Sequence, residues 1–313
     1  MTVDVLVVGA GVAGLAAARA CVADGRSVRV IDKSRGVGGR MASRRVGDAR
    51  FDHGAQFFTV RSPEFAEVVD AAADAGAVVS WTNGFDDEPD GYPRWRGATG
   101  MTDLCKWMAA DAGIAPLLSE TVTDLRSHPA RAYVLTAPVP QSLAVLSFSA
   151  MLPDPMLQRE LAAIAYKPTI AILASLDRAP TGFPAHGGRQ FPADHPELAF
   201  VTDNQAKGVS TAPAVTIHLS NDRSLRQWNE PDDAVVGEAL DLVADLLGEA
   251  TATATQVQRW RYAGPVETHP EATLVWGRDP VVALAGEAFA GPKVEGAFRS
   301  GLAAGAAVLD RLG

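Results

Sequence analysis

Three glycines near the amino end, Gly9, Gly11 and Gly14, have the spacing that suits binding of a pyrophosphate. The first permits a tight turn, the second lets backbone approach the phosphates, and the third lets a helix pack close to a strand. Asp32 follows eighteen residues after Gly14. Because a carboxylate there accepts two hydrogen bonds from a ribose and would repel a 2′-phosphate, these four residues predict a dinucleotide site.

The elements expected around these residues place them at one end of a parallel sheet. Residues 3–8 (VDVLVV) are an apolar, β-branched run typical of a buried parallel strand. An alanine-rich helix follows the glycines and directs its unpaired N–H groups at the phosphates. A second strand over residues 28–31 leads to Asp32. The alternative, a secretory signal, needs a basic segment before its apolar core, and only Asp4 stands there.

Composition and charge limit the classes of function that this chain could have. The 313 residues suffice for two domains, and 47 % hydrophobic content is ordinary for a globular protein. The net charge of −9 argues against nucleic acid or an anionic membrane as a partner. We expect no membrane span beyond the amino end and no metal site, since no His and Cys cluster at ligand spacing. The two cysteines, Cys21 and Cys105, predict buried free thiols in a cytoplasmic protein.

Two polar segments follow Asp32. Residues 32–45 (DKSRGVGGRMASRR) combine an irregular glycine loop with four arginines. We interpret them as a second clamp on the pyrophosphate, with Arg40 directly after the glycine pair; the alternative is a solvated basic turn. Residues 51–58 (FDHGAQFF) embed Asp52, His53 and Gln56 in an apolar run. Buried polar groups need partners, and a flavin ring edge offers donors and acceptors, although His53 alone is more often a structural histidine.

The middle of the chain predicts a second sheet with flanking helices. Helices are expected from Ser62 to Gly76 and over residues 101–112, 155–165 and 232–247, and strands over residues 168–177, 198–203 and 214–220. His218 lies within the last of these strands, where it faces either a cavity or water.

The final third contains an aromatic and basic strand, RWRYA (259–263). Alternation puts Trp260 and Tyr262 on one face and the two arginines on the other. The aromatic face could stack on a nicotinamide ring and an arginine could contact a phosphate; ordinary cross-strand packing is the alternative. A strand over residues 281–286 and a helix over residues 296–312 follow. The start of that helix would direct its positive dipole end at the flavin N1–C2=O edge.

The segments GVGGRMASRR (36–45) and DHGAQFFT (52–59) resemble blocks of the renalase family, a branch of the amine-oxidase-type flavoproteins. Further segments resemble family blocks in the same order, so the resemblance covers nearly the whole chain: residues 91–104, 133–141, 198–204, 258–263 and 286–301. The resemblance implies a non-covalent FAD, the fold of amine oxidases, and oxidation of dihydronicotinamide species. Val122 resembles the valine whose backbone contacts the adenine.

The chain departs in two places from the families that it resembles. The three-stranded meander that usually follows Val122 is shortened or missing, because only residues 123–131 precede the next strand. Amine oxidases of this fold commonly carry a lysine in the strand that corresponds to residues 168–177, where it holds a water near the flavin N5. Here the strand is apolar and Lys167 lies just before it, which counts against amine oxidation.

We therefore expect an α/β protein with an α+β substrate lobe. A Rossmann-type FAD-binding domain would comprise residues 1–60, 101–145 and 258–313, and a discontinuous substrate domain on a mixed or antiparallel sheet would comprise residues 61–100 and 146–257, with the flavin between them. The expected cofactor-binding residues are Gly9, Gly11, Val12, Ala13, Gly14, Asp32, Lys33, Gly39, Arg40, Gln56, Phe57, Val122, Gly286, Glu287, Val294, Glu295 and Ala297. The substrate-site candidates are Gln56, His218, Trp260 and Tyr262.

The expected function is an FAD-dependent oxidase for the 2- or 6-dihydro isomers of NAD(P). Hydride passes to the flavin N5 and dioxygen reoxidises the flavin, giving hydrogen peroxide. Such a transfer needs stacking and orientation and no general base. The alternative is an amine oxidase or desaturase on the same fold; a non-catalytic flavoprotein has no support in the sequence. The expected partners are the small-molecule substrate and dioxygen, in a monomer or homodimer.

Overall fold

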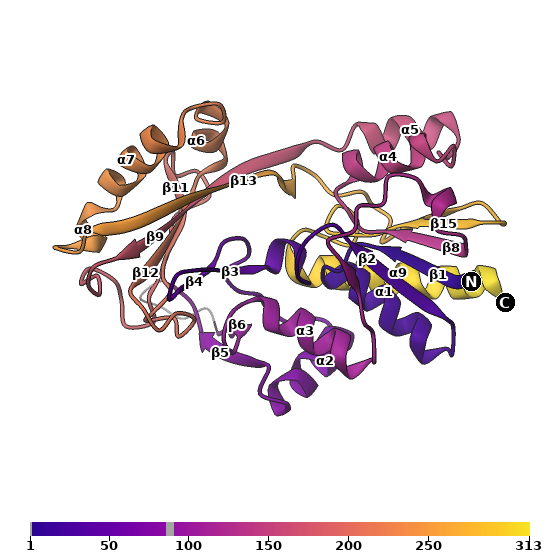
Figure 1. Ribbon diagram of the computed structural model, residues 1–313, viewed down its shortest axis with the longest axis horizontal. Helices are drawn as coiled ribbons and strands as arrows, with labels where there is room; N and C mark the ends of the chain where they lie inside the picture. The colour runs from indigo at the N-terminus through magenta and orange to yellow at the C-terminus, as the bar shows by residue number, and fades with distance from the viewer. Residues whose placement is uncertain (1, 86–90) are drawn as a thin grey trace.

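The first sheet is the one predicted from the amino end. The computed structural model describes residues 2–85 and 91–313 and shows two lobes linked by long strands (Figure 1). The sheet has the order β14-β15-β8-β1-β2-β7, and only the edge strand β14 is antiparallel to its neighbour. Its strands are β1 (Val3–Val8), β2 (Val28–Asp32), β7 (Leu117–Leu118), β8 (Ala130–Leu135), β14 (Leu274–Trp276) and β15 (Val281–Leu284). The predicted Rossmann-type α/β fold is confirmed.

Helices cover both faces of this sheet, because alternate strand residues are apolar on both sides. Val5 and Val7 pack against α1 (Val12–Ala23) and α9 (Lys293–Leu312). On the opposite face Leu6 packs with α4 (Val139–Phe148) and α5 (Pro155–Ala162). Two further helices, α2 (Pro63–Asp74) and α3 (Thr102–Asp111), pack beside α1 and α9.

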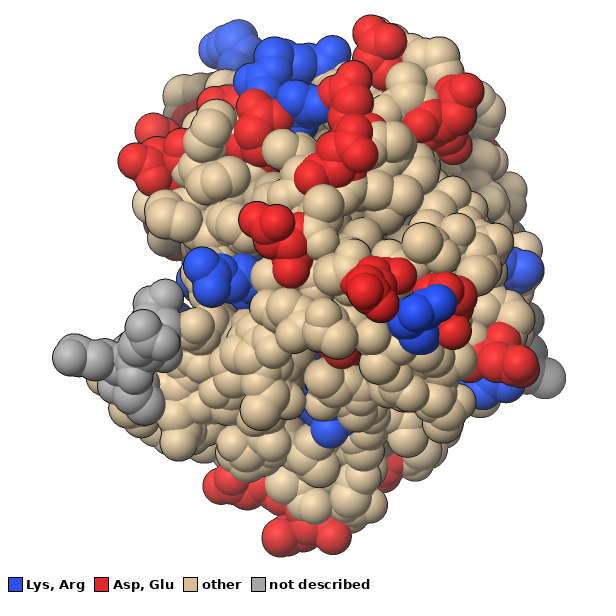
Figure 2. Space-filling view, turned by 90° about the vertical axis from the view of Figure 1, so that its left-hand side faces the viewer, with Lys and Arg blue, Asp and Glu red and all other residues tan. Residues whose placement is uncertain are grey.

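The second lobe is built on an antiparallel sheet of order β10-β11-β12-β9-β13. Its strands are β9 (Tyr166–Leu176), β10 (Gly188–Gln190), β11 (Leu198–Asp203), β12 (Ala214–Leu219) and β13 (Ala252–Pro265). Three helices follow β12 in the chain: α6 (Asn221–Arg226), α7 (Asp232–Leu242) and α8 (Ala244–Leu247). Figure 2 faces this lobe and shows acidic side chains beside a group of Lys and Arg in its upper part.

The single helix predicted over residues 232–247 is wrong. Val243 leaves the helical conformation (φ −114°, ψ 13°) and is buried in the core beneath the second sheet, so the chain forms α7 and α8 in succession. The short helix α6 was not predicted; the Ser220 hydroxyl accepts a hydrogen bond from the Arg223 N–H and caps it.

Two hairpins and two 3₁₀ turns complete the fold. The hairpin of β3 (Ser43–Val46) and β4 (Ala49–Asp52) reaches the second sheet, where Phe51 packs on Leu173. The hairpin of β5 (Val78–Thr82) and β6 (Arg94–Gly97) lies beside it. The turns are η1 (Gly39–Met41) and η2 (Leu125–Ser127). The turn η2 is the one helix or strand that the structure records over residues 123–129, ahead of β8, in place of a meander.

Several element ends differ from the predicted ones. Helix α5 ends at Ala162, three residues early, because β9 already begins at Tyr166. Helix α9 begins at Lys293, three residues before the predicted start. Ser62 precedes α2 as predicted, but its hydroxyl does not cap the helix; the Glu295 carboxylate accepts the Arg61 and Ser62 N–H groups instead.

The predicted domain boundaries fall inside elements. Strand β13 pairs with β9 on both sides of residue 258, and residues 145 and 146 both lie in α4. Leu161 of α5 belongs to the core of the first sheet. We therefore propose that the lobes divide near residues 165 and 265. Among the described helices, none has the length and apolar character that a bilayer crossing requires.

Candidate functional site

The two glycine-rich loops lie side by side at the ends of β1 and β2. Gly9 takes φ +115°, and a Cβ on Gly14 would lie 1.9 Å from the Gly9 oxygen, so the turn and the close helix packing both require glycine. Gly11 pairs with Gly38 in an isolated bridge. A Cβ on Gly11 would meet no atom nearer than 3.9 Å. The backbone at Gly11 therefore borders open space of the kind that a pyrophosphate needs.

Asp32 ties the first loop to β2. Its carboxylate accepts the Ala10 N–H at 2.6 Å and the Ser34 N–H at 2.7 Å. A carboxylate has about four acceptor positions, so capacity remains for ribose hydroxyls. Val12 and Ala13 lie buried in the first turn of α1, while Lys33 is exposed. Asp32 thus orders the loop and also stands where a ribose contact is expected.

The carboxyl-terminal candidates surround the start of α9. Gly286 takes φ +141°, and Val294 and Ala297 are buried in the first turns of α9. Glu295 is directed at the start of α2, as described above. A Cβ on Gly296 would lie 1.8 Å from the Gly291 oxygen, so this glycine serves a close backbone approach. Val122 is buried beside the first sheet.

Arg40 and Glu287 form an ion pair within the first lobe, beside strand β13 of the second lobe. Both terminal nitrogens of the Arg40 guanidinium donate to the Glu287 carboxylate, and one also donates to the Tyr262 carbonyl at 3.1 Å. The register of β13 against β9 shifts between Trp260 and Gly264, and this irregularity exposes the carbonyl that Arg40 satisfies. The Arg40 terminal nitrogens thus join the second glycine loop to Glu287 and to β13. A contact of Arg40 with the pyrophosphate stays a prediction.

The other arginines of that loop are arranged differently. Arg44 donates to Gln258 at 2.7 Å, and Arg35 and Arg45 are exposed. The backbone of Gly38 and Gly39, and not a cluster of arginines, is what the second loop presents to the first loop.

Two histidines and a tryptophan form a wall between the lobes. The His53 ring stacks on Trp260 with centroids 5.4 Å apart and planes 9° apart. The Trp260 indole N–H donates to the His53 carbonyl at 2.8 Å, and the His218 Nε2 lies 3.3 Å from the same oxygen. His218 therefore faces this wall and not water. We refer to His53, His218 and Trp260 as the imidazole–indole wall.

Both imidazoles of the wall are neutral at neutral pH. Burial lowers the pKa of His53 to about 4, assisted by the Arg44 charge. Burial also lowers the pKa of His218 to about 4. The Nδ1 atom of His53 is buried without a hydrogen-bond partner. Because buried polar atoms are nearly always paired, this atom marks a place for a polar group supplied by a ligand or water.

Tyr262 continues the wall along the same face of β13. Its ring meets Tyr166 edge-on at 5.3 Å, and the Tyr166 hydroxyl accepts the Val139 N–H. Burial raises the pKa of Tyr166 to about 12, so it stays protonated. Arg259 and Arg261 take the opposite face, where Arg259 pairs with Asp232. That an arginine of this strand contacts a phosphate stays a prediction.

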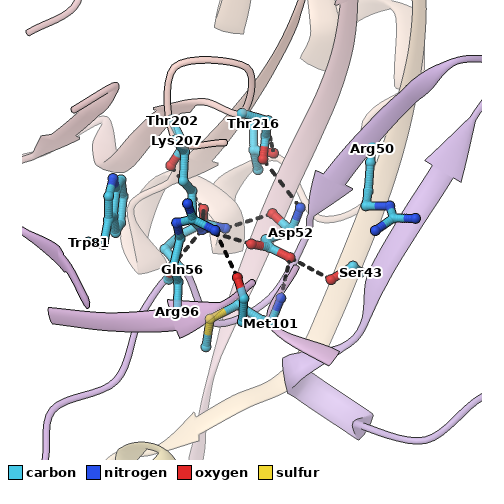
Figure 3. Close-up of polar contacts among 12 residues, drawn as sticks. Ser43, Arg50, Asp52, Gln56, Trp81, Arg96, Met101, Thr202, Lys207 and Thr216 are labelled. Atoms are coloured by element: carbon cyan, nitrogen blue, oxygen red, sulfur yellow. Dashed lines mark hydrogen bonds and ion pairs between the residues drawn. The ribbon is translucent and has the colours of Figure 1, made fainter. Parts of the chain in front are cut away.

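Gln56 lies in a buried polar cluster behind the wall (Figure 3). Its amide nitrogen donates to the Asp52 carbonyl at 2.6 Å, and its oxygen accepts from Thr202 and Lys207. Lys207 is fully buried, with Nζ 2.8 Å from the Asp52 carboxylate. Gln56 therefore braces its own turn, and its side chain is occupied by protein partners.

Sequence reasoning missed Lys207 because a lysine in a polar loop normally indicates solvent exposure. Its burial follows from the fold, which seats the loop between β11 and β12 on the turn after β4. Phe57, a cofactor-site candidate, joins an aromatic cluster with Phe85 and Phe200, with ring centroids 5.1 and 6.0 Å away.

Comparison with known proteins agrees with this geometry. Residues 7–72 match the NAD(P)-binding Rossmann-like domain, and residues 113–309 match the family described as flavin containing amine oxidoreductase. The chain belongs to this amine oxidoreductase family. It is 46 % identical to a putrescine oxidase of Kocuria rosea over 67 residues, which are 21 % of this chain and 14 % of that protein.

Solved structures share the whole fold. A proposed protoporphyrinogen oxidase from Exiguobacterium sp. 255-15 superposes with a TM-score of 0.72 at 13 % identity, covering 100 % of this chain and 99 % of the other. A putrescine oxidase bound to putrescine gives 0.69 at 15 % identity, covering 99 % of both chains. At such identities the likeness concerns the fold alone.

FAD is the cofactor of this amine oxidoreductase. The residues fit it: the open backbone at Gly11 suits the pyrophosphate, Asp32 suits a ribose, and the buried His53 Nδ1 has no hydrogen-bond partner within the protein. Both cysteine thiols are buried, with the pKa of Cys21 raised to about 11 and that of Cys105 to about 12 by burial. This inertness supports the prediction of a non-covalent flavin.

Proposed function

We propose that this flavin-containing oxidoreductase oxidises a dihydronicotinamide dinucleotide, namely the 2- or 6-dihydro isomers of NAD(P). The observation that carries the proposal is the neutral imidazole–indole wall. A dihydropyridine is a flat, uncharged ring, and stacked rings such as His53 and Trp260 offer it a matching surface. The resemblance to the renalase family points to the same substrate class.

The charges around the wall support this choice. Asp52 is held by Lys207 and Glu287 by Arg40, so each of these two carboxylates already has a cation. An ammonium substrate would have to compete with a built-in partner for either carboxylate. A neutral dihydropyridine makes no such demand, because its ring carries no positive charge. Hydride transfer from it also needs no base to remove a proton.

FAD, when bound, would supply the acceptor for the hydride, and dioxygen would take up the two electrons with two protons to give hydrogen peroxide. The chain's own residues bind and orient. The wall fixes the plane of the substrate ring, and the Arg40–Glu287 pair holds the strand that carries Tyr262 against the glycine loops. A displacement of about 1 Å in such a site can cost on the order of 100-fold in rate.

Amine oxidation is the second candidate. The family match and the putrescine oxidase relative favour it. The aromatic rings of the wall could also attract an ammonium group through their faces. The two candidates leave different products: NAD(P)⁺ and peroxide from the first, an aldehyde, ammonia and peroxide from the second.

Aerobic turnover with product analysis tests the proposal. We expect equimolar NAD(P)⁺ and hydrogen peroxide from a 2- or 6-dihydro isomer. Trp260→Leu should raise KM for that substrate about 2- to 10-fold, since an aromatic stack is worth about 0.5–1.5 kcal/mol. Trp107→Leu, on α3 beside Arg19, is the matched control and should leave KM unchanged. Aldehyde formed from an amine, with no oxidation of any dihydro isomer, would replace the proposal by the second candidate.

A further inference from the structure

The ammonium group of Lys207 makes all three of its hydrogen bonds to one turn of the chain, residues 52–56. Its Nζ lies 2.8 Å from the Asp52 carboxylate, 2.6 Å from the Gln56 carbonyl oxygen and 3.2 Å from the Gln56 amide oxygen. These three acceptors match the three protons of an ammonium group. The side chain is fully buried, and its nitrogen also lies 4.7 Å from the centre of the Trp81 ring.

The turn that Lys207 contacts also contains His53. It runs from Asp52 to Gln56, and the Gln56 amide closes it by donating to the carbonyls of Asp52 and Gly54. The other Asp52 oxygen accepts from the Ser43 hydroxyl and the Met101 N–H. Lys207 therefore contacts both ends of the turn, at Asp52 and at Gln56. His53 lies between these ends and belongs to the imidazole–indole wall.

A buried ion pair is a poor means of stabilising a fold. Removing two charges from water costs much of what their attraction returns, and apolar residues of similar volume often serve stability equally well. Burial lowers the pKa of Lys207, which shows that cost directly. An ammonium group does one thing that an apolar side chain cannot: it fixes acceptors at both ends of a turn in defined directions.

We propose that Lys207 is a positioning residue of the active site, which acts through the Asp52–Gln56 turn to hold His53 flat against Trp260. The inference rests on the proposed function only in taking the imidazole–indole wall as the place where substrate binds. The loop between β11 and β12 thereby controls a residue of the wall without contacting the substrate.

The first test uses Gln56→Met, which removes one of the three Lys207 acceptors together with the amide nitrogen that closes the turn, and leaves the Asp52–Lys207 pair intact. We expect the variant to retain FAD, and the rate of flavin reduction by the best dihydronicotinamide to fall on the order of 10- to 100-fold. Lys106→Met, which removes an exposed lysine on α3, is the control. Its flavin should be reduced at the same rate as the flavin of the unmodified protein.

A second readout does not depend on the substrate. Histidine titration by NMR, with the His53 signal assigned from a His53→Gln sample, should show the His53 pKa rising from about 4 towards 6.5 in Gln56→Met as the ring leaves its buried position. If no dihydronicotinamide reduces the flavin, the proposed function fails but this titration still decides the present inference. An unchanged His53 pKa in Gln56→Met would overturn it.

The double variant Asp52→Asn/Lys207→Met separates positioning from stability. Removing both charges should restore folding and FAD content relative to Lys207→Met alone, and flavin reduction should remain slow. Recovery of the unmodified rate in the double variant would show that the pair serves stability only and would refute the positioning role.

Discussion

Because His53 and His218 are buried, the folded protein should lose stability in mildly acidic solution. Both have an ordinary pKa of 6.5 and a folded-state pKa of about 4. Below pH 6.5 these two histidines bind protons in the unfolded chain but stay neutral in the folded protein. The free energy of unfolding therefore falls as the pH is lowered from about 6.5 to about 4. The difference in pKa corresponds to about 3 kcal/mol for each histidine at the lower limit, and to about 2 kcal/mol at pH 5.

The assay is urea unfolding of the FAD-loaded protein at pH 7.5 and pH 5.0, with the same excess of free FAD throughout. The groups that face the pair are Arg44, Lys207 and Asp52. His218→Gln leaves them in place and removes one titrating site. The loss of stability between the two pH values should therefore be smaller in His218→Gln by about 2 kcal/mol.

Asp203, whose pKa burial raises, acts in the opposite direction, since it gains protons on folding. Its effect is common to both proteins and cancels in the comparison. An identical pH dependence in the unmodified protein and in His218→Gln would refute the reasoning, because it would mean that His218 titrates alike in the folded and unfolded chains.

Two further predictions concern the glycines. The unmodified protein should be yellow and should release intact FAD on acid precipitation. Gly11→Val should be purified as colourless apoprotein, because its side chain occupies the place of the pyrophosphate. A yellow Gly11→Val variant would contradict the placement of the pyrophosphate at Gly11. Gly301→Ala should lower the melting temperature, because its Cβ would lie 2.0 Å from the Ala13 oxygen where α9 packs on α1. Gly237→Ala on α7 meets no atom within 4 Å and should leave the melting temperature unchanged or slightly higher.

The parts of the fold that depend on local pattern could be predicted from the sequence. Strand β1, the glycine turn and strand β2 follow from short-range rules, because β-branched runs, glycine spacing and a terminal acid leave little choice of conformation. The break at Val243 could not be predicted, because helical periodicity continues through it and only the core under the second sheet draws the side chain inward.

In the candidate site, too, features set by local sequence could be predicted, and those set by distant partners could not. Trp260 and Tyr262 share a face because strand alternation requires it. The partners of Arg40 and Gln56 could not be predicted, because Glu287 and Lys207 lie 247 and 151 residues away in the chain. Through such long-range contacts Arg40 joins the second glycine loop to β13, and Gln56 braces its own turn. The contacts of both residues with the cofactor stay predictions.

The central claim, a dihydronicotinamide as hydride donor, is tested most directly by anaerobic stopped-flow mixing. The FAD-loaded protein is mixed in turn with the 2-dihydro, 6-dihydro and ordinary 4-dihydro forms of NAD(P) and with putrescine, and loss of flavin absorbance is followed. We predict fast bleaching by the 2- or 6-dihydro isomer, slow bleaching by the 4-dihydro form, and peroxide on admission of air. Fast bleaching by putrescine, with none by any dihydro isomer, would contradict the account.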